Sequence, residues 1–402
     1  MGAAFAVLFL AYGVQFSYGI FITGMAADLG WSRADTALPF SIYVFVYSAL
    51  SAVTGQATDR FGPRRVLTVG AVLLGLGWGL SALVTKPWHL NVTLGIVAAV
   101  GMSVAWVPCN ATVARWFTRR RGTAVAIAST GASFGNFIVP VLAALLVQHW
   151  GWRVTLAGLA LSSALGILCA ARYMVRDPEA LGLWPDGATV RPPQAELTGG
   201  HTVRELWWTE SFMLIIGIYF FTWLVIFVPF VHAPAYAQDL GLSRAMAAST
   251  LSAIGIGGMV GRLSSGVISD AFGRCPTLLL VCVLQAVGFV LFARAHGAVG
   301  LWSAALVFGF SYGGGVSVLP ALCGDLFGRA HVASVVGAIF AIAGSPAAVG
   351  PYVAGWLYDT TGSYGGAFWL AAALNVMAGL LTGVLVWRAR ASVAVLKLGG
   401  CA

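Results

Sequence analysis

Long apolar segments alternate with short polar ones along the whole chain, and this pattern predicts a bundle of membrane-spanning helices. A helix needs about 20 consecutive apolar residues to cross a bilayer. Twelve segments meet this requirement, at approximately residues 3–25, 36–57, 66–85, 90–113, 122–147, 153–173, 211–234, 245–268, 276–294, 299–322, 332–357 and 365–388.

A longer polar stretch separates the sixth apolar segment from the seventh. It is acidic and contains several prolines, which is a composition typical of linkers. We therefore predict an N-terminal six-helix bundle over 1–175, a cytoplasmic linker over 176–210, a C-terminal six-helix bundle over 211–390 and a cytoplasmic tail over 391–402.

The composition agrees with this pattern and excludes a soluble fold. Hydrophobic residues make up 59% of the chain and charged residues only 9%, whereas soluble domains carry about 25% charged residues. The first apolar segment follows Met1 without a basic region, so we expect a permanent helix rather than a secretory signal peptide. The predicted fold class is an all-α membrane protein with twelve transmembrane helices. The outer faces of these helices are expected to contact the lipid bilayer.

The net charge of +9 does not indicate nucleic-acid binding, because the basic residues lie in the loops between apolar segments. If both termini are cytoplasmic, sixteen of the 22 Lys and Arg residues fall on the inner side and five on the outer side. This asymmetry follows the positive-inside rule. We therefore predict that both termini are cytoplasmic.

The two halves of the chain repeat each other with one constant offset. The segment Asp28–Ala34 recurs as Asp239–Ala245, a shift of 211 positions, and the same shift relates Gly55 to Gly266, Asp59 to Asp270, Gly62 to Gly273 and Pro140 to Pro351. Two repeated bundles related by an axis along the membrane normal, with a binding cavity near the midplane, are a transporter architecture.

The segment from Gly55 to Arg65 resembles the signature loop of the major facilitator superfamily, and Gly266–Arg274 is a weaker copy of it. The resemblance implies the major facilitator fold and a latch on the cytoplasmic side. Simple solvation of two helix ends is the alternative. The predicted latch residues are Asp59, Arg60, Gly62, Arg64, Asp270, Gly273 and Arg274.

Further segments are similar to the monocarboxylate transporters and the related oxalate/formate exchangers: Phe16–Gly19, Trp116–Gly131, Ser311–Gly328, Gly350-Pro351 and Asp359. The chain departs from the animal members at Ile22, where they carry a lysine, and at Gly258, where they carry an aspartate. Both family residues are implicated in proton coupling. The oxalate exchangers also carry a lysine in the eleventh helix, where this chain has neither Lys nor Arg.

Arg262 lies inside an apolar segment, where a charge costs about 3 kcal/mol or more. It is eight residues before Asp270, which places it about 12 Å from the inner helix end. Its guanidinium can bind a carboxylate with two parallel hydrogen bonds; a structural arginine bonded to carbonyls or to an acid is the alternative. No other Lys or Arg is so deep in a predicted span, and one fixed cation matches one carboxylate.

Three more residues are candidate substrate contacts. Asn110 can hydrogen-bond a hydroxyl or carboxylate, or it can join two helices. The resemblance places Tyr18 and Tyr312 where the family lines its cavity, although tyrosines also pack routinely in helix bundles.

Proton coupling requires a titratable group that senses Arg262, and four candidates remain open: His232, Asp239, Asp28 and Asp325. Histidine ordinarily titrates near pH 6.5. Asp28 and Asp239 occupy equivalent repeat positions, which favours a structural role at the outer helix ends.

Together these features predict a proton symporter for a small monocarboxylate, L-lactate or pyruvate, working by alternating access as a monomer in the plasma (cytoplasmic) membrane. An organic-anion exchanger of the oxalate/formate type is the alternative. A Gly-x-Ser-x-Gly motif at 131–135 lies in a predicted helix without catalytic partners, so we expect no enzyme activity. We expect no cofactor, metal or nucleic-acid partner, and the scattered cysteines are interpreted as packing residues.

Overall fold

The computed structural model describes residues 1–31, 33–188 and 199–399, and it confirms the all-α fold class. Helices joined by short turns make up almost all of this described part, whose one isolated β-bridge pairs Gly200 with Gly328. The chain divides into two compact units. Unit 1 consists of Met1–Val203 and Cys323–Ala341, and unit 2 of Arg204–Leu322 and Ile342–Ala402.

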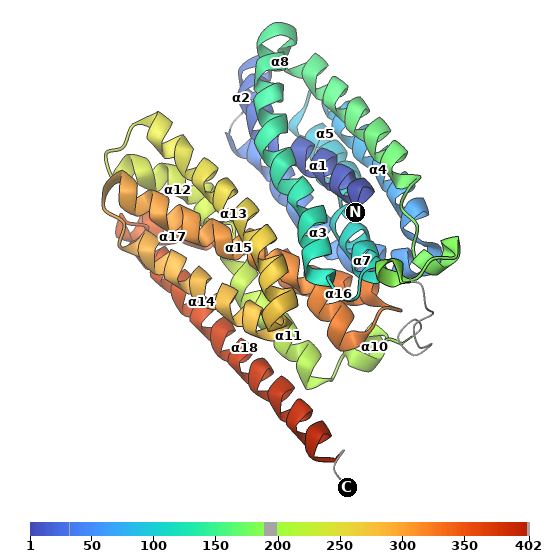
Figure 1. Cartoon of the computed structure of the whole chain (residues 1–402). Coiled ribbons are helices and arrows are strands. Elements are labelled where there is room, and N and C mark those ends of the chain that lie inside the picture. Colours follow the sequence, from blue (N-terminus) through green and yellow to red (C-terminus); the bar gives the residue numbers. More distant parts are fainter. Residues whose placement is uncertain (32, 189–198, 400–402) are drawn as a thin grey trace. The chain divides into compact units, whose positions relative to one another are not determined.

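Unit 1 holds the first half of the chain together with a segment from much later in the sequence (Figure 1). Its elements are α1 (Gly2–Phe16), α2 (Tyr18–Leu29), α3 (Arg33–Phe61), α4 (Pro63–Ser81), α5 (Pro87–Val92), the π-helix η1 (Thr93–Ala98), α6 (Ala99–Met102), α7 (Trp106–Trp116), α8 (Arg121–Ala171), the short 3₁₀ turns η2 (Pro178–Leu181) and η3 (Pro185–Gly187), and most of α16 (Val332–Gly344).

Unit 2 holds the remaining helices. They are α10 (Val203–Leu206), α11 (Glu210–Leu224), α12 (Val228–Asp239), α13 (Arg244–Phe272), α14 (Arg274–Ala293), most of α15 (Gly297–Phe327), the 3₁₀ turn η4 (Ser345–Ala348), α17 (Val349–Thr361) and α18 (Gly365–Gly399).

These elements agree with a chain that crosses the membrane many times. Ten continuous helical stretches in the described residues are long and apolar enough to cross a membrane. One of them, α8, contains two spans, because Gly151 interrupts it with non-helical backbone angles (φ 72°, ψ 169°). The sharp bend between the two arms of α8 is visible in Figure 1. Helix α4 has 19 residues, begins with Pro63, Arg64 and Arg65, and lies where the span at 66–85 is predicted.

The surface of the helices is apolar, as lipid contact requires. Large aliphatic side chains on α4 and α8, among them Leu76, Leu80, Leu161 and Leu165, are between 45% and 62% exposed. A soluble protein rarely exposes extensive apolar patches of this kind. The protein is therefore a multi-pass membrane protein.

Candidate functional site

Arg262 lies in the interior of α13, ten residues before the helix ends at Phe272. Its side chain is buried, with 4% relative exposure. The guanidinium carbon is 5.5 Å from the centroid of the Tyr312 ring, which comes from α15 in the same unit. A cation over an aromatic face is attracted by the negative potential of the ring.

Small residues bring α13 and α15 close enough for this contact. A Cβ atom on Gly261 would lie 1.9 Å from the Phe310 carbonyl oxygen, and one on Gly313 would lie 2.0 Å from the Gly258 carbonyl oxygen. The two backbones are therefore in direct contact, which no larger residue permits.

Gly258, where the family resemblance led us to compare this chain with an aspartate, borders the Tyr312 ring. A Cβ on Gly258 would lie 3.7 Å from Cδ1 of Tyr312. The side chain of Ile22, the other departure, lies outside the described residues.

An aromatic cluster fixes the orientation of Tyr312. Phe230 on α12 meets its ring edge to face, with centroids 5.3 Å apart, and Phe308 one turn earlier on α15 stacks with it at 6.5 Å. Phe308 in turn packs against Phe289 of α14. Aromatic pairs in these geometries favour one ring orientation, so Tyr312 presents a fixed surface to Arg262.

Asn110 on α7 in unit 1 is completely buried. Its amide nitrogen donates to the Trp106 carbonyl oxygen at 3.0 Å within the same helix. Its Oδ1 atom has no hydrogen-bond partner among the residues that the structure describes. A buried acceptor without a donor is costly, so this oxygen is available to a hydroxyl.

Tyr18 is also buried in unit 1, but inside an aromatic cluster. Its ring stacks on Phe40 at 5.2 Å and meets Trp78 edge to face at 6.1 Å. This environment is typical of packing. A substrate contact for Tyr18 remains a prediction.

Two of the four proton-coupling candidates form ion pairs in unit 1. Asp28 accepts hydrogen bonds from Trp152 Nε1 at 2.8 Å and from Arg153 at 2.9 Å. Asp325 pairs with Arg121, whose Nε also donates to the Ala114 carbonyl oxygen. Both carboxylates thus have a structural partner at a helix end.

The other two candidates lie on α12 in unit 2. His232 is half-buried, with Nε2 2.9 Å from the Pro351 carbonyl oxygen and Nδ1 3.3 Å from the Tyr364 hydroxyl. Asp239 is exposed at the end of the same helix.

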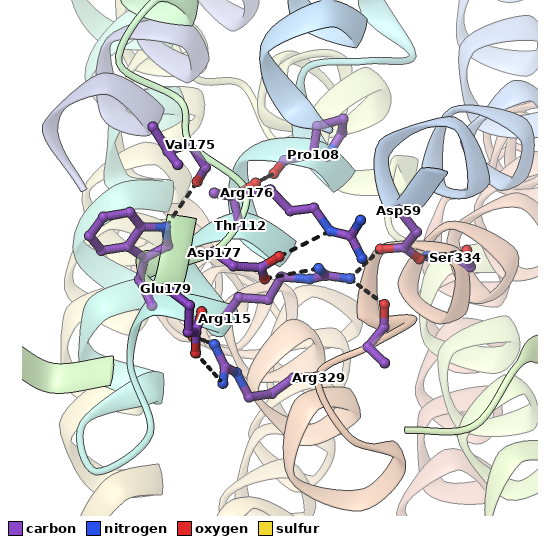
Figure 2. Close-up of polar contacts among 12 residues, drawn as sticks. Asp59, Pro108, Thr112, Arg115, Val175, Arg176, Asp177, Glu179, Arg329 and Ser334 are labelled. Atoms are coloured by element: carbon purple, nitrogen blue, oxygen red, sulfur yellow. Dashed lines mark hydrogen bonds and ion pairs between the residues drawn. The ribbon is translucent and has the colours of Figure 1, made fainter. Parts of the chain in front are cut away.

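A buried polar network in unit 1 surrounds the signature-loop aspartate. One carboxylate oxygen of Asp59 accepts a hydrogen bond from the Arg115 guanidinium at 2.6 Å. The other oxygen accepts from the backbone N–H and the hydroxyl of Ser334 at 2.7 and 2.6 Å. Ser334 is in the first turn of α16, where the helix dipole favours a negative charge. Figure 2 shows Arg115 between the carboxylates of Asp59 and Asp177. Arg115 forms an ion pair with Asp177 at 3.1 Å.

A second buried arginine extends this network into the linker. Arg329 pairs with Glu179 at 3.2 Å and donates to the Arg115 carbonyl oxygen at 2.7 Å (Figure 2). Arg115 also donates to the Ala330 carbonyl oxygen. Because buried arginines require several partners, the acids just after α8 hold two arginines that are far apart in the sequence.

The linker also anchors the turn between α7 and α8. Asp186 accepts from the backbone N–H groups of Thr118 and Arg119 at 3.0 and 2.9 Å, and from the Thr118 hydroxyl. Burial raises the pKa of Asp186, but these hydrogen bonds and the charge of Arg121 outweigh it and lower the pKa overall.

The two copies of the signature loop use their aspartates differently. Asp270 pairs with Arg274 four residues later, and Arg274 also donates to Ser269 at 2.8 Å. Both loops share a glycine with positive φ at the helix junction, 82° at Gly62 and 95° at Gly273, a conformation that L-residues with side chains disfavour.

The remaining predicted latch residues lie at the surface. Arg60 and Arg64 are exposed, and the Arg60 guanidinium lies 5.2 Å from the Phe61 ring. Five central members of the network were not predicted from the sequence: Arg115, Arg329, Asp177, Glu179 and Ser334. The one available signal was the pair of acids that follows the sixth span.

Comparison with known proteins agrees with the fold and the motifs. Residues 4–349 match the family model of the Major Facilitator Superfamily. Monocarboxylate transporter 13 of Bos taurus is 30% identical over 390 residues, covering 96% of this chain and 87% of the relative. Human monocarboxylate transporter 11 is 29% identical over 388 residues, covering 92% and 79%. A crystal structure of the E. coli fucose:proton symporter FucP superimposes with a TM-score of 0.72 at 16% identity, covering 95% of this chain and 97% of that one.

The chain is therefore a transporter of the Major Facilitator Superfamily. Within that superfamily it belongs to the monocarboxylate transporter family.

Proposed function

We propose that this protein transports a small monocarboxylate such as L-lactate together with a proton across the cell membrane. The observation that carries the proposal is Arg262, a buried cation in the interior of α13 beside the fixed ring of Tyr312. A guanidinium can bind a planar carboxylate through two parallel N–H groups.

The environments of the other buried arginines support this assignment. Arg115, Arg121 and Arg329 are also less than 6% exposed, but they lie at helix ends and not in the interior of a span. Arg262 alone occupies the apolar interior of a span by its position in the sequence. One such cation balances one carboxylate, whereas the second charge of a dicarboxylate would be desolvated at high cost.

We further propose that the polar network around Asp59 and Arg115 is a latch that must open during the transport cycle. Its support is the burial of both side chains and their bonds to the first turn of α16. In this scheme Asp270 and Arg274 form a local pair at the equivalent position of the repeat.

The test is uptake of labelled L-lactate into proteoliposomes that contain no internal anion. With an acidic exterior and a neutral interior, we expect concentrative uptake that collapses when a protonophore is added. An exchanger would show uptake only after the vesicles are loaded with a counter-anion, and that result would overturn the symport assignment.

Arg262→Gln tests the site directly, and Arg294→Gln is the matched control. Arg294 is an exposed arginine at the end of α14 that lies against the Trp369 ring, so it has the same chemistry outside the interior of a span. We expect Arg262→Gln to abolish lactate binding and uptake, and Arg294→Gln to retain both. Lactate affinity that survives Arg262→Gln in folded protein would contradict the proposed site.

A further inference from the structure

The hydrogen bonds of His232 define which ring nitrogen carries the proton. Nε2 lies 2.9 Å from the Pro351 carbonyl oxygen on α17. A carbonyl oxygen only accepts, so Nε2 is the donor. In the neutral ring Nδ1 is then an acceptor, and the hydroxyl of Tyr364 at 3.3 Å is its donor.

The same two contacts also suit the protonated ring. After Nδ1 gains a proton it becomes a donor, and the Tyr364 oxygen can accept from it, because a phenol hydroxyl both donates and accepts. His232 can therefore change its charge without losing either partner. The His232 ring is not crowded by α17, because even a Cβ atom on Gly355 would lie 3.8 Å from Cε1 of the ring.

Tyr364 connects this histidine to the surface through a second tyrosine. Its side chain is 7% exposed, and its ring stacks on that of Tyr358 with centroids 4.4 Å apart. The Tyr358 side chain lies beside the carboxylate of Asp239. Asp239 is exposed and lies two helical turns after His232 on α12.

We propose that these four residues form the route by which the transported proton enters unit 2: Asp239 attracts it, Tyr364 passes it on and His232 holds it. This inference rests on the proposed proton symport. Tyr358 acts as a positioning residue, because its stacked ring fixes the orientation of Tyr364.

The transfer step balances without any further reactant. A hydronium ion that the charge of Asp239 draws to this end of unit 2 protonates the Tyr364 oxygen, while the O–H proton of Tyr364 moves to Nδ1 of His232. One O–H bond breaks and one forms at the tyrosine, an N–H bond forms at the histidine, and water is released. The ring gains one positive charge and the tyrosine is unchanged.

The surroundings favour this direction of transfer. The titratable groups described around the ring are Tyr236 and Asp239 on α12, Tyr358 and Asp359 on α17, and Tyr364 in the loop before α18. Both charged members are acidic, so this end of the unit attracts protons. Burial, then the charges of Asp239, Tyr358 and Asp359, raise the pKa of Tyr364, which keeps its hydroxyl protonated during the cycle.

Tyr364→Phe tests the route, because it removes the hydroxyl and retains the stacked ring. The control is Tyr352→Phe, which removes an equivalent hydroxyl from the same half of the chain at a side chain that is 77% exposed. Two rates are measured in proteoliposomes: lactate uptake driven by a pH gradient, and exchange of labelled for unlabelled lactate at equal pH. Exchange requires no net proton transfer.

We expect Tyr364→Phe to slow gradient-driven uptake by about tenfold or more while exchange stays near the wild-type rate, and Tyr352→Phe to change neither. His232→Gln should show the same separation of the two rates. Gradient-driven uptake by Tyr364→Phe that equals wild type would overturn the proton route alone. Loss of uptake and exchange together would assign Tyr364 to substrate binding or folding and also overturn it. Wild-type protein that fails to respond to a pH gradient would instead refute the proposed symport.

Discussion

Replacing Asp59 with Asn tests the latch at its most constrained point. The Asp59 side chain is 7% exposed and accepts three hydrogen bonds, from Arg115 and from the N–H and hydroxyl of Ser334. Asparagine has nearly the same shape, but one carboxylate oxygen becomes an NH₂ group that cannot accept. The variant therefore removes the charge and leaves donors facing each other.

The expected cost follows from the burial of the pair. Removing one partner of a buried ion pair costs about 3–5 kcal/mol. Arg115 keeps Asp177 and the Ala330 carbonyl oxygen, so we expect the lower end of this range. A loss of about 3 kcal/mol changes an equilibrium constant by roughly 100-fold. The latch of the variant should accordingly be open in a much larger fraction of molecules.

Cys323 provides the assay. It is fully buried near the C-terminal end of α15, two residues before Asp325. In a variant that keeps Cys323 as its single cysteine, a membrane-permeant maleimide should react when the latch opens. We expect Asp59→Asn to accelerate this labelling by roughly 100-fold.

Asp270→Asn is the matched control, since it makes the same change in the second copy of the loop. Asp270 pairs with Arg274 of the neighbouring turn, so we expect less than about a tenfold effect on Cys323. Equal labelling of Asp59→Asn and wild type, or equal acceleration by both variants, would refute the latch.

Three other changes test separate parts of the molecule. Asn110→Ala should raise the apparent KM for lactate several-fold with little change in kcat, because Oδ1 is lost as an acceptor, and an unchanged KM would leave Asn110 a structural residue. Gly313→Ala should destabilise the protein by about 1–3 kcal/mol in thermal unfolding, because its Cβ would lie 2.0 Å from the Gly258 oxygen, whereas Gly379→Ala, with open space around the Cβ, should be neutral. The folded-state pKa of Asp186 is lowered, so the stability that its carboxylate contributes is present above about pH 4 and is lost as the pH falls through the folded pKa. The Thr118 backbone amide should therefore lose protection from hydrogen exchange only in that acidic range. Asp186→Asn should remove this pH-dependent change in protection.

The fold and Arg262 were predictable because their signals are local. An apolar segment of sufficient length must become a helix in lipid, since its backbone polar groups have no other partners. The single charge inside such a segment is visible without knowledge of its neighbours. The repeat likewise identified the positions of Asp59 and Asp270 before any contact was known.

The partners of these residues were not predictable, because they depend on contacts between distant positions. Arg115 binds Asp177, 62 positions later, and the carbonyl of Ala330, 215 positions later; Arg329 reaches back 150 positions to Glu179. From the sequence these were loop charges that set the orientation. Packing buries them, and burial turns a solvated charge into one that requires a partner.

Local patterns in the sequence thus predicted apolar helical spans, their repeat and the position of Arg262 in an apolar helix. The contacts came from the fold: Tyr312 lies against Arg262, His232 contacts Tyr364, and linker acids complete the network around Asp59. The physical reason is that these interactions differ in the sequence distance between their partners. The backbone polar groups of a helix in lipid find their hydrogen-bond partners within one segment. The partner of a buried charge is instead the residue that the packing of several segments brings within hydrogen-bond distance.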